Sequence, residues 1–271
     1  MESDIENAWL SLKSILSQTK PAIIAFSGGV DSTFLLKAAV EIIGKERVRA
    51  VICESPLIPS SELASALSFV SSLDVRYDII PTDELSIPGF INNTEERCYL
   101  CKNYRFGRIR EFTENQQSSY ILEGSNVDDT SDFRPGMRAV KEHQVRSPLL
   151  EAGLTKAVIR ELSKKFKLPT WNKPSDACLA TRIQCHQPIT VEKLKMIETA
   201  ETFFRQLGVT GVLRVRYIDD TARIEMNPDE IQLLADIFLR ERITNELKKL
   251  GFRKVTLDLE GYRMGSTNSN A

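Results

Sequence analysis

The chain has 271 residues, of which 42% are hydrophobic and 27% charged, as in an ordinary globular protein that forms one large domain or two smaller ones. Its formal net charge of -1 gives no overall attraction to nucleic acid or anionic lipid, so we expect neither partner. Residues 1–16 carry acidic groups before their apolar positions, unlike a secretory signal, and no apolar run is long enough to span a membrane. We therefore expect a cytoplasmic protein.

Apolar residues in the N-terminal stretch recur at helical spacing and predict an amphipathic helix; they are Ile5, Trp9, Leu12 and Leu16. Beyond it, short apolar strands alternate with helical patterns. Strands are expected at 22–26, 48–53, 75–80 and 119–124, and helices at 32–43, 60–73 and 95–113. This alternation predicts an α/β fold, with helices on both faces of a Rossmann-like parallel sheet that binds ligands at the carboxyl ends of its strands.

Past residue 187 the pattern changes. A helix is expected at 190–207, followed by two strands at 212–218 and 221–226, a long helix at 229–249, and a last strand at 253–259. This order predicts a small α+β domain. We therefore expect two domains, residues 1–187 and residues 188–271.

The stretch "SGGVDS", residues 27–32, directly follows the first expected strand. Ser27, Gly28 and Gly29 stand where the chain must turn sharply, and glycine permits the close approach that an anion requires. The helix that begins near Ser32 directs its N-terminal dipole to the same point, so we expect a phosphate there. The stretch is neither a Walker A loop nor a dinucleotide fingerprint. Asp31 beside a phosphate indicates an accompanying cation such as Mg²⁺.

A polar loop, "EGSNVDDTSDFRPGMRA" at 123–139, follows the fourth expected strand and so lies at the same edge of the sheet. It is either a solvated loop or a contact for the nucleotide or substrate. Its position next to the phosphate loop favours the contact, and Arg134 is the best clamp for a phosphate or carboxylate. The residues that we assign to this contact are Gly124, Asn126, Asp128 and Arg134, together with Arg182 from a later stretch.

Two further stretches carry arginines. "WNKPSDACLATRI" holds Cys178 and Arg182, and "LRVRY" places Arg214 and Arg216 on one face of a strand. Paired guanidiniums repel each other unless an anion or carboxylates lie between them, so this pair is either an anion site or part of a salt-bridge ladder. Glu201 and Glu225, on the preceding helix and the adjoining strand, could pair with these arginines or hold a metal.

Together these stretches resemble one family of the PP-loop ATP pyrophosphatases, the LarE-type sulfurtransferases. The matching segments run over nearly the whole chain: "FSGGVDS", "RCYLCK", "EGSNVDD", "PSDACLATR", "LRVR", "ARIE" and "LDLEGYRMGS". The resemblance implies an adenine nucleotide alpha hydrolase-like fold and a homo-oligomer, with a hexamer as one candidate. It also implies ATP-dependent thiolation of pyridinium-3,5-biscarboxylic acid mononucleotide, with release of AMP and pyrophosphate, on the way to the nickel-pincer nucleotide cofactor.

Residue roles follow from the resemblance. It assigns the ATP phosphates and Mg²⁺ to Ser27, Gly28, Gly29, Val30, Asp31 and Ser32. It assigns the substrate phosphate to Arg214 and Arg216, and a metal to Glu201 and Glu225. Cys178 matches the cysteine that delivers sulfur. In one branch of the family this cysteine sacrifices its own sulfur, and in another three cysteines hold a [4Fe-4S] cluster.

The remaining cysteines help to choose between the branches. Cys98 and Cys101 fall at i and i+3 of an expected helix, so their thiols share a face, and neighbouring basic residues favour the thiolate. A disulfide is disfavoured in the cytoplasm. With Cys178, the pair could hold a [4Fe-4S] cluster that leaves one iron open for a replaceable sulfide. We favour this cluster as cofactor over a zinc site completed by Cys185 or His186, a persulfide relay or inert packing.

The remaining cysteine and the two histidines are expected to have no role in the chemistry. Cys53 is expected in the core, and His143 and His186 at the surface.

The alternative functions lie within the same superfamily. An amide-forming ligase such as an NAD or GMP synthetase would need no cysteine. A tRNA thiolase would need a broad basic face, which a near-neutral chain lacks. Besides ATP and the nucleotide substrate, the expected partner is sulfide or a sulfur donor.

Overall fold

The computed structural model describes residues 2–114, 120–130, 135–174 and 178–263. The chain divides into two compact units. The first unit comprises Met1–Glu84 and Glu96–Asp176, and the second comprises Leu85–Glu95 and Ala177–Ala271. Residues 177–187 thus group with the C-terminal unit, whereas the sequence pattern assigned them to the N-terminal domain.

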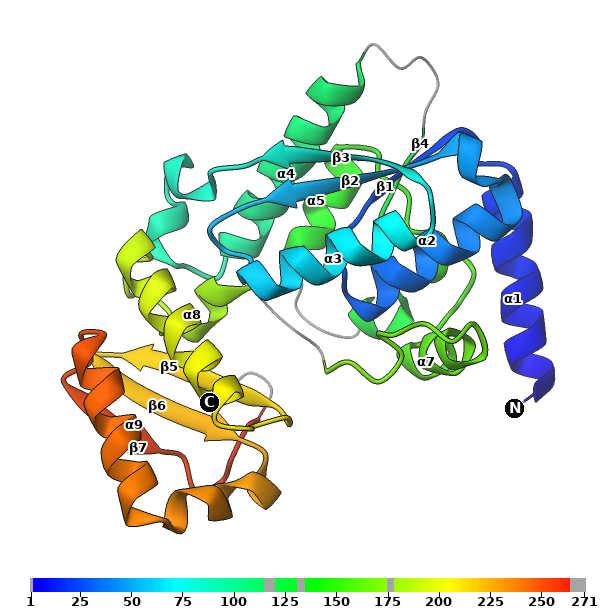
Figure 1. The fold of residues 1–271 in the computed structure, drawn as a ribbon. Helices are drawn as coiled ribbons and strands as arrows, with labels where there is room; N and C mark the ends of the chain where they lie inside the picture. Colours follow the sequence, from blue (N-terminus) through cyan, green and yellow to red (C-terminus); the bar gives the residue numbers. More distant parts are fainter. Residues whose placement is uncertain (1, 115–119, 131–134, 175–177, 264–271) are drawn as a thin grey trace. The chain divides into compact units, whose positions relative to one another are not determined.

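The first unit is an α/β fold around a parallel sheet, as predicted (Figure 1). The sheet has four strands in the order β3-β2-β1-β4. The elements of the first unit are α1 (Glu2–Ser17), β1 (Ala22–Ala25), α2 (Val30–Ile43), η1 (Lys45–Arg47), β2 (Val48–Glu54), α3 (Ser60–Ser72), β3 (Arg76–Pro81), α4 (Arg97–Thr113), β4 (Tyr120–Leu122), η4 (Val127–Thr130), α5 (Gly136–Glu142), α6 (Pro148–Glu151) and α7 (Lys156–Lys165). The short helix η2 (Glu84–Ser86) lies at the boundary between the two units. Helices connect the parallel strands, because the chain must cross over a face of the sheet to begin the next strand in the same direction.

The strand β1 packs on both faces, and its successive side chains point to opposite sides of the sheet. In β1, Ala22 and Ile24 belong to one core cluster, which includes residues of α1, α2, α3 and α7. Ile23 belongs to the other cluster, which includes residues of α4 and α5. Cys53 at the end of β2 lies in this second cluster and is 9% exposed, which confirms its expected place in the core.

The strand order brings two loops together. β1 pairs in parallel with β2 on one side and with β4 on the other. The chain moves outward from β1 through β2 to β3 and then returns to β4, so the loops after β1 and β4 leave the sheet side by side. Such a switch point is where open α/β sheets bind their ligands.

The second unit has a three-stranded sheet in the order β5-β6-β7. β5 and β6 are antiparallel, and β7 runs parallel to β6. The elements of this unit are η3 (Phe90–Asn92), η5 (Leu179–Arg182), α8 (Val191–Gln206), β5 (Leu213–Ile218), β6 (Thr221–Met226), η6 (Pro228–Ala235), α9 (Ile237–Lys249) and β7 (Lys254–Leu257). Asp219 and Asp220 join β5 to β6 with φ of 45° and 60°, a pair of left-handed residues typical of a tight hairpin.

The prediction of a single helix at 229–249 is wrong. The segment consists of the 3-10 helix η6 and the separate helix α9. Asp236 divides them because its side chain accepts a 2.8 Å hydrogen bond from the N–H of Leu239 and so caps α9.

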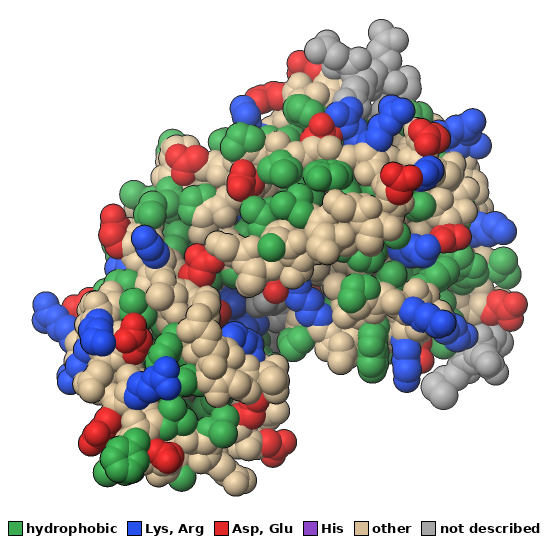
Figure 2. All heavy atoms as spheres, in the orientation of Figure 1, with side chains coloured by type: hydrophobic (Ala, Val, Ile, Leu, Met, Phe, Trp, Pro, Cys, Tyr) green, Lys and Arg blue, Asp and Glu red, His purple; other side chains and the backbone are tan. Residues whose placement is uncertain are grey.

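No helix among the described residues is both long and apolar enough to cross a membrane. On the face of the molecule drawn in Figure 2, the basic and acidic side chains of the described residues are interspersed. This mixture agrees with the formal net charge of -1.

Candidate active site

The loop between β1 and α2 has the geometry of an anion site. Gly28 has φ +73°, and a Cβ added to it would lie 2.9 Å from the Cβ of Ala66 in α3. Gly29 is the N-cap of α2, and among the described residues no side chain caps this helix, so its first N–H groups face the loop. Ser27 and Ser32 brace the turn through hydroxyl groups 3.0 Å apart. A phosphate at this helix N-terminus would meet both backbone donors and the helix dipole.

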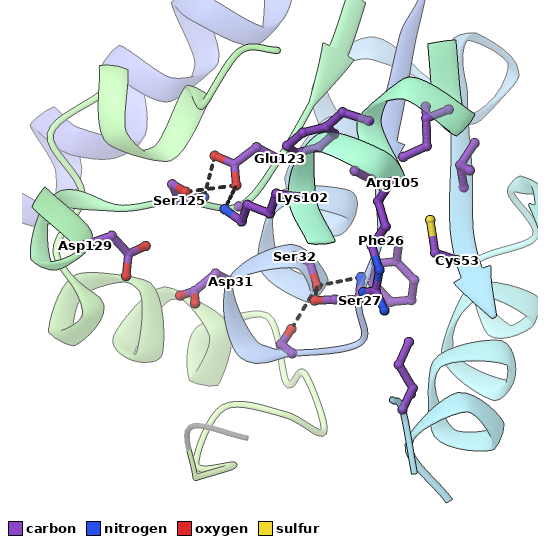
Figure 3. A pocket seen from close by; sticks show the side chains of 17 residues that line it. Phe26, Ser27, Asp31, Ser32, Cys53, Lys102, Arg105, Glu123, Ser125 and Asp129 are labelled. Atoms are coloured by element: carbon purple, nitrogen blue, oxygen red, sulfur yellow. Dashed lines mark hydrogen bonds and ion pairs between the residues drawn. The ribbon is translucent and has the colours of Figure 1, made fainter. Parts of the chain in front are cut away.

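A cavity of about 400 Å³ opens beside this loop, within the usual ~300–1,000 Å³ of ligand pockets (Figure 3). All the residues that line it belong to the first unit. Those with polar or reactive side chains are Ser27, Asp31, Ser32, Cys53, Lys102, Arg105, Glu123, Ser125 and Asp129. The cavity therefore joins the phosphate loop, the loop after β4 and one side of α4.

Gly124 allows the loop after β4 to approach the phosphate loop. A Cβ at this position would lie 3.0 Å from the N atom of Ser32 and 3.2 Å from the Cβ of Asp31. Glu123 anchors the loop on the other side, because its buried carboxylate accepts hydrogen bonds from Ser125 and Ser147. Gly124 thus lies beside the phosphate loop, and its contact with a nucleotide stays a prediction.

Asp31 lies in the first turn of α2 and pairs with Lys156 of α7. Burial raises the pKa of the Asp31 carboxyl; Lys156 opposes this rise and the negative charge of Asp129 adds to it. The Oδ1 atom of Asp31 is buried and has no hydrogen-bond partner among the described residues. A carboxylate oxygen left in this way beside a second carboxylate and a phosphate loop fits Mg²⁺, which prefers one or two carboxylates together with phosphate oxygens.

Two lysines surround the phosphate loop. Lys156 contacts Asp31, and the ammonium of Lys173 pairs with Glu62 and lies 3.4 Å from the carbonyl oxygen of Gly28. Both ammonium groups therefore place positive charge beside the N-terminus of α2. Neither lysine could be predicted as a site residue from the sequence, because nothing in the local pattern connects them to the loop.

Arg105 is a further cavity residue that the sequence analysis missed. It donates a 2.6 Å hydrogen bond to Glu84, which is fully buried and also accepts from Ser55. Although burial favours the neutral acid, Arg105 and its neighbours hold the pKa of Glu84 below its usual value. Burial opposes the charge on Arg105 as well, but Cys101, Glu84 and Cys53 outweigh that effect and raise its pKa.

Arg105 lies close to Cys101, which is one of the two cysteines of α4. Cys98 is exposed and Cys101 is partly buried, one helical turn apart. Arg105 lies one turn further along the same helix. The spacing Cys101–Arg105 was therefore a signal in the sequence, because residues at i and i+4 of a helix are neighbours.

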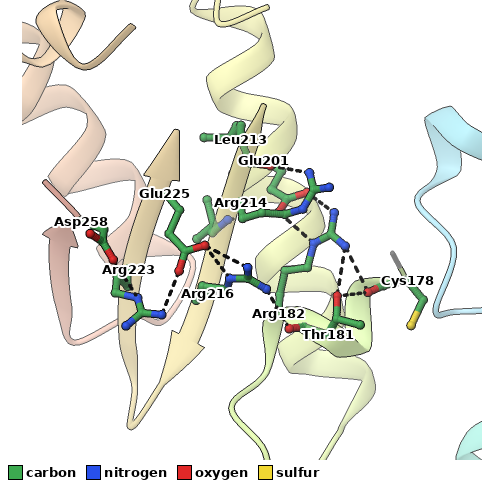
Figure 4. Close-up of polar contacts among 11 residues, drawn as sticks. Cys178, Thr181, Arg182, Glu201, Leu213, Arg214, Arg216, Arg223, Glu225 and Asp258 are labelled. Atoms are coloured by element: carbon green, nitrogen blue, oxygen red, sulfur yellow. Dashed lines mark hydrogen bonds and ion pairs between the residues drawn. The ribbon is translucent and has the colours of Figure 1, made fainter. Parts of the chain in front are cut away.

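The second unit contains a group of side chains that we call the arginine cluster: the predicted site residues Arg182, Arg214 and Arg216, together with Arg223, which was not predicted (Figure 4). The first three of these side chains are at most 5% exposed. Arg216 binds Glu225 at 2.9 Å, and Arg182 binds Glu201 at 3.2 Å. Glu225 also pairs with Arg223 at 2.8 Å. Both carboxylates that we expected near a metal are thus engaged with arginines, and their metal role stays a prediction.

Among the described residues, the guanidiniums of this group pair with the carboxylates of Glu201, Glu225 and Asp258. Guanidiniums gathered in this way are suited to bind an anion such as a phosphate. The ring of Tyr262 flanks two of these guanidiniums, because its centroid lies 5.3 Å from Cζ of Arg214 and 6.0 Å from Cζ of Arg216.

Cys178 is attached to the arginine cluster through its backbone. Its carbonyl oxygen accepts hydrogen bonds from Arg182 at 3.1 Å and from the Thr181 side chain at 2.8 Å. Its thiol points away from these partners in Figure 4 and is partly exposed.

The other predicted residues are placed as follows. Asn126 is buried, and its side-chain oxygen accepts from the N–H of Asp128 at 3.0 Å. Asp128 in turn accepts from the N–H of Lys156. Arg134 lies outside the described residues. Cys98 and Cys101 belong to the first unit and Cys178 to the second.

Comparison with known proteins adds two findings. The NAD synthase family model matches residues 5–113, which include the phosphate loop and end at the last residue of α4. A GMP synthase of Aeropyrum pernix is 26% identical over 203 residues, 68% of this chain and 39% of that protein.

Two longer matches extend over both units. The pyridinium-3,5-bisthiocarboxylic acid mononucleotide synthase of Lactiplantibacillus plantarum is 34% identical over 258 residues, 95% of this chain and 92% of that protein. An uncharacterised protein of Synechocystis is 37% identical over 269 residues, 99% of this chain and 98% of its own. These matches therefore cover the arginine cluster and the cysteine segments as well as the phosphate loop.

Proposed function

This chain belongs to the LarE-type family of ATP-using PP-loop sulfurtransferases, and from that premise we propose that it thiolates pyridinium-3,5-biscarboxylic acid mononucleotide. Two rounds of thiolation, one on each carboxylate, would give the bisthiocarboxylic acid mononucleotide that the Lactiplantibacillus plantarum relative is named for making. The reaction would be a step in the synthesis of a nickel-pincer nucleotide.

The first half of the proposed reaction takes place at the cavity of the first unit. A substrate carboxylate oxygen attacks the α-phosphorus of ATP, the bond to the bridging oxygen breaks, and pyrophosphate leaves. The N-terminal N–H groups of α2 bind the phosphates, and Lys156 and Lys173 supply positive charge where pyrophosphate departs. Asp31 and Asp129 would hold Mg²⁺, which neutralises phosphate charge.

The second half replaces AMP with sulfur. A sulfur nucleophile attacks the acyl carbon of the adenylate, the acyl–oxygen bond breaks, and AMP leaves with that oxygen. The arginine cluster would bind the phosphate of the substrate. The observation that carries this proposal is the hydrogen bond from Arg182 to Cys178, because it fixes the sulfur-bearing residue to the cluster that would hold the substrate.

We further propose that Cys98, Cys101 and Cys178 hold a [4Fe-4S] cluster. The donor set fits such a group: Cys98 and Cys101 lie one turn apart on α4 and both are accessible, and the charge of Arg105 beside Cys101 favours the thiolate that iron requires. When bound, the cluster would supply a replaceable sulfur atom at its open iron. The alternative is that Cys178 gives up its own sulfur once.

Counting products separates the two sources of sulfur. The anaerobically reconstituted protein is incubated with ATP, Mg²⁺, sulfide and the pyridinium substrate, and AMP and thiolated product are measured per chain. We expect about four irons per chain and more than one product per chain. Replacement of Cys98, Cys101 or Cys178 by Ala should remove the iron. A stop at one product, with Cys178 lighter by the mass of H₂S, would refute the cluster and establish sacrifice.

The match to the NAD synthase family makes an amide-forming ligase the second candidate. Such an enzyme uses ammonia as its nucleophile and needs no cysteine. The variant with all three cysteines replaced by Ala should still bind ATP, because no cysteine lies in the phosphate loop, and should form no product with sulfide. Amide formation by this variant with ammonium would instead establish the ligase.

A further inference from the structure

Three side chains with metal-binding atoms meet in the second unit, outside the sites described above. They are Glu95, Cys185 and His186, and their ligand atoms all lie within 4.8 Å of one another. We propose that they form a separate site for a zinc-like divalent cation. The segments that supply them are about 90 residues apart in the chain.

The distances between these atoms suit a tetrahedral ion. Oε1 of Glu95 lies 3.4 Å from Nε2 of His186 and 3.9 Å from Sγ of Cys185. Bonds of about 2.0–2.3 Å at tetrahedral angles place neighbouring ligand atoms about 3.3–3.6 Å apart. An ion at the centre therefore requires shifts of only a few tenths of an ångström in these two separations.

Buried hydrogen bonds hold the two segments together. The side chain of Asn93, which is fully buried, donates to the carbonyl oxygens of Ile183 at 3.2 Å and Gln184 at 2.8 Å. The carbonyl oxygen of Asn93 in turn accepts from the N–H of His186 at 3.0 Å. This clamp lies two residues before Glu95 and directly before Cys185, so the backbone that carries the ligands is positioned without the metal.

The donor types select the kind of metal. A thiolate, an imidazole and a carboxylate together suit Zn²⁺, whereas Mg²⁺ and Ca²⁺ take oxygen ligands. The thiol of Cys185 now donates to the carbonyl oxygen of Asn93 at 3.2 Å, and on binding it would release its proton to solvent. The side chains of Glu95 and His186 are 50% and 60% exposed, so a water molecule can complete the tetrahedron.

The bound ion would join the segment Leu85–Glu95 to the body of the second unit. This segment is contributed to that unit from the middle of the chain. A metal that bridges Glu95 to Cys185 and His186 would oppose its separation. The site shares no residue with the proposed cluster of Cys98, Cys101 and Cys178, and it does not depend on the proposed reaction.

Cobalt absorption tests this proposal directly. The protein with Cys98, Cys101 and Cys178 replaced by Ser is titrated anaerobically with Co²⁺. This background removes the three other accessible thiols. We expect one Co²⁺ per chain, with a thiolate-to-cobalt charge-transfer band and the intense visible bands of a tetrahedral site, and displacement of the cobalt by Zn²⁺. Absence of the charge-transfer band would overturn the proposal.

Ligand variants identify the residues. Cys185→Ser, His186→Ala and Glu95→Gln in that background should each weaken Zn²⁺ binding by about 100-fold or more, beyond the ~10–100-fold typical of outer-shell partners. His143→Ala is the matched control, because His143 is bound to Asn103 at 2.8 Å and lies in the first unit. Unchanged Zn²⁺ affinity in Cys185→Ser would also overturn the proposal.

A measurement in the otherwise unaltered chain guards against misfolding of the triple variant. Zinc should raise the melting temperature of the wild-type protein by more than that of Cys185→Ser, because Cys98, Cys101 and Cys178 are available to zinc in both proteins. Without metal the two proteins should melt together, because the Cys185 side chain is only partly buried. An equal rise in both proteins would refute the site.

Discussion

Gly28→Ala tests whether the phosphate loop needs glycine for its conformation, for its contact with α3, or for both. The residue has φ +73°, where an alanine costs about 1–2 kcal/mol. The new Cβ would also lie 2.9 Å from the Cβ of Ala66, closer than such atoms approach, and crowding of this kind costs about 1–3 kcal/mol. We expect a loss of about 2–5 kcal/mol in the free energy of unfolding, with displacement of the loop away from α3 and loss of ATP binding.

Gly153→Ala is the matched control. Gly153 has the same φ of +73°, but no atom lies within 4 Å of an added Cβ. Its loss should be about 1–2 kcal/mol, with ATP binding intact. Adding Ala66→Gly to Gly28→Ala removes the close pair and should restore part of the ATP affinity, although glycine within α3 itself costs about 0.5–1 kcal/mol.

Thermal unfolding measures the loss of stability in each variant, and calorimetric titration with ATP measures its ATP affinity. A domain of this size loses about 2–4 °C of melting temperature for each kcal/mol. Equal losses of stability in Gly28→Ala and Gly153→Ala, with ATP affinity unchanged in both, would refute the argument from the contact with Ala66.

Other predictions concern the charged groups. Asp31→Asn should abolish the tightening of ATP binding by Mg²⁺, measured by titration with and without the metal; persistent tightening would contradict the proposed role of its Oδ1 atom. Arg182→Lys should slow thiolation by about 100-fold through misplacement of Cys178, without changing ATP affinity in calorimetry; an unchanged thiolation rate would contradict it. Arg105→Met leaves the carboxylate of Glu84 buried without its cation, and should lower the free energy of unfolding by roughly 3 kcal/mol in urea; a loss under 1 kcal/mol would contradict it. Because the pKa of Glu84 in the folded protein lies below its ordinary 4.5, its contribution is present above pH 4.5 and is lost as the pH falls through the lower folded value. Urea unfolding between pH 3 and 6 should therefore show a shallower acid loss in Glu84→Gln; parallel curves would contradict this.

Local patterns predicted the fold of the first unit correctly because they express short-range physics. Alternating apolar strands and helices can bury both faces of a sheet in only a few ways, and the strand–glycine–helix turn at Ser27–Ser32 has few other uses. The sequence pattern was less informative at 229–249, where the apolar spacing of η6 resembles that of a helix. The extended backbone of Asp236 and its capping hydrogen bond separate the two segments.

The sequence by itself determined the phosphate loop, its position at the carboxyl edge of the sheet and the spacing of Cys98 and Cys101. Each of these depends on residues within one or two turns of one another. Tertiary structure alone decided which residues from distant segments share an environment. The pairing of Lys156 with Asp31, and the meeting of Glu95 with Cys185 and His186, join segments about 90 or more residues apart. Such contacts depend on how the elements pack, which no local pattern encodes.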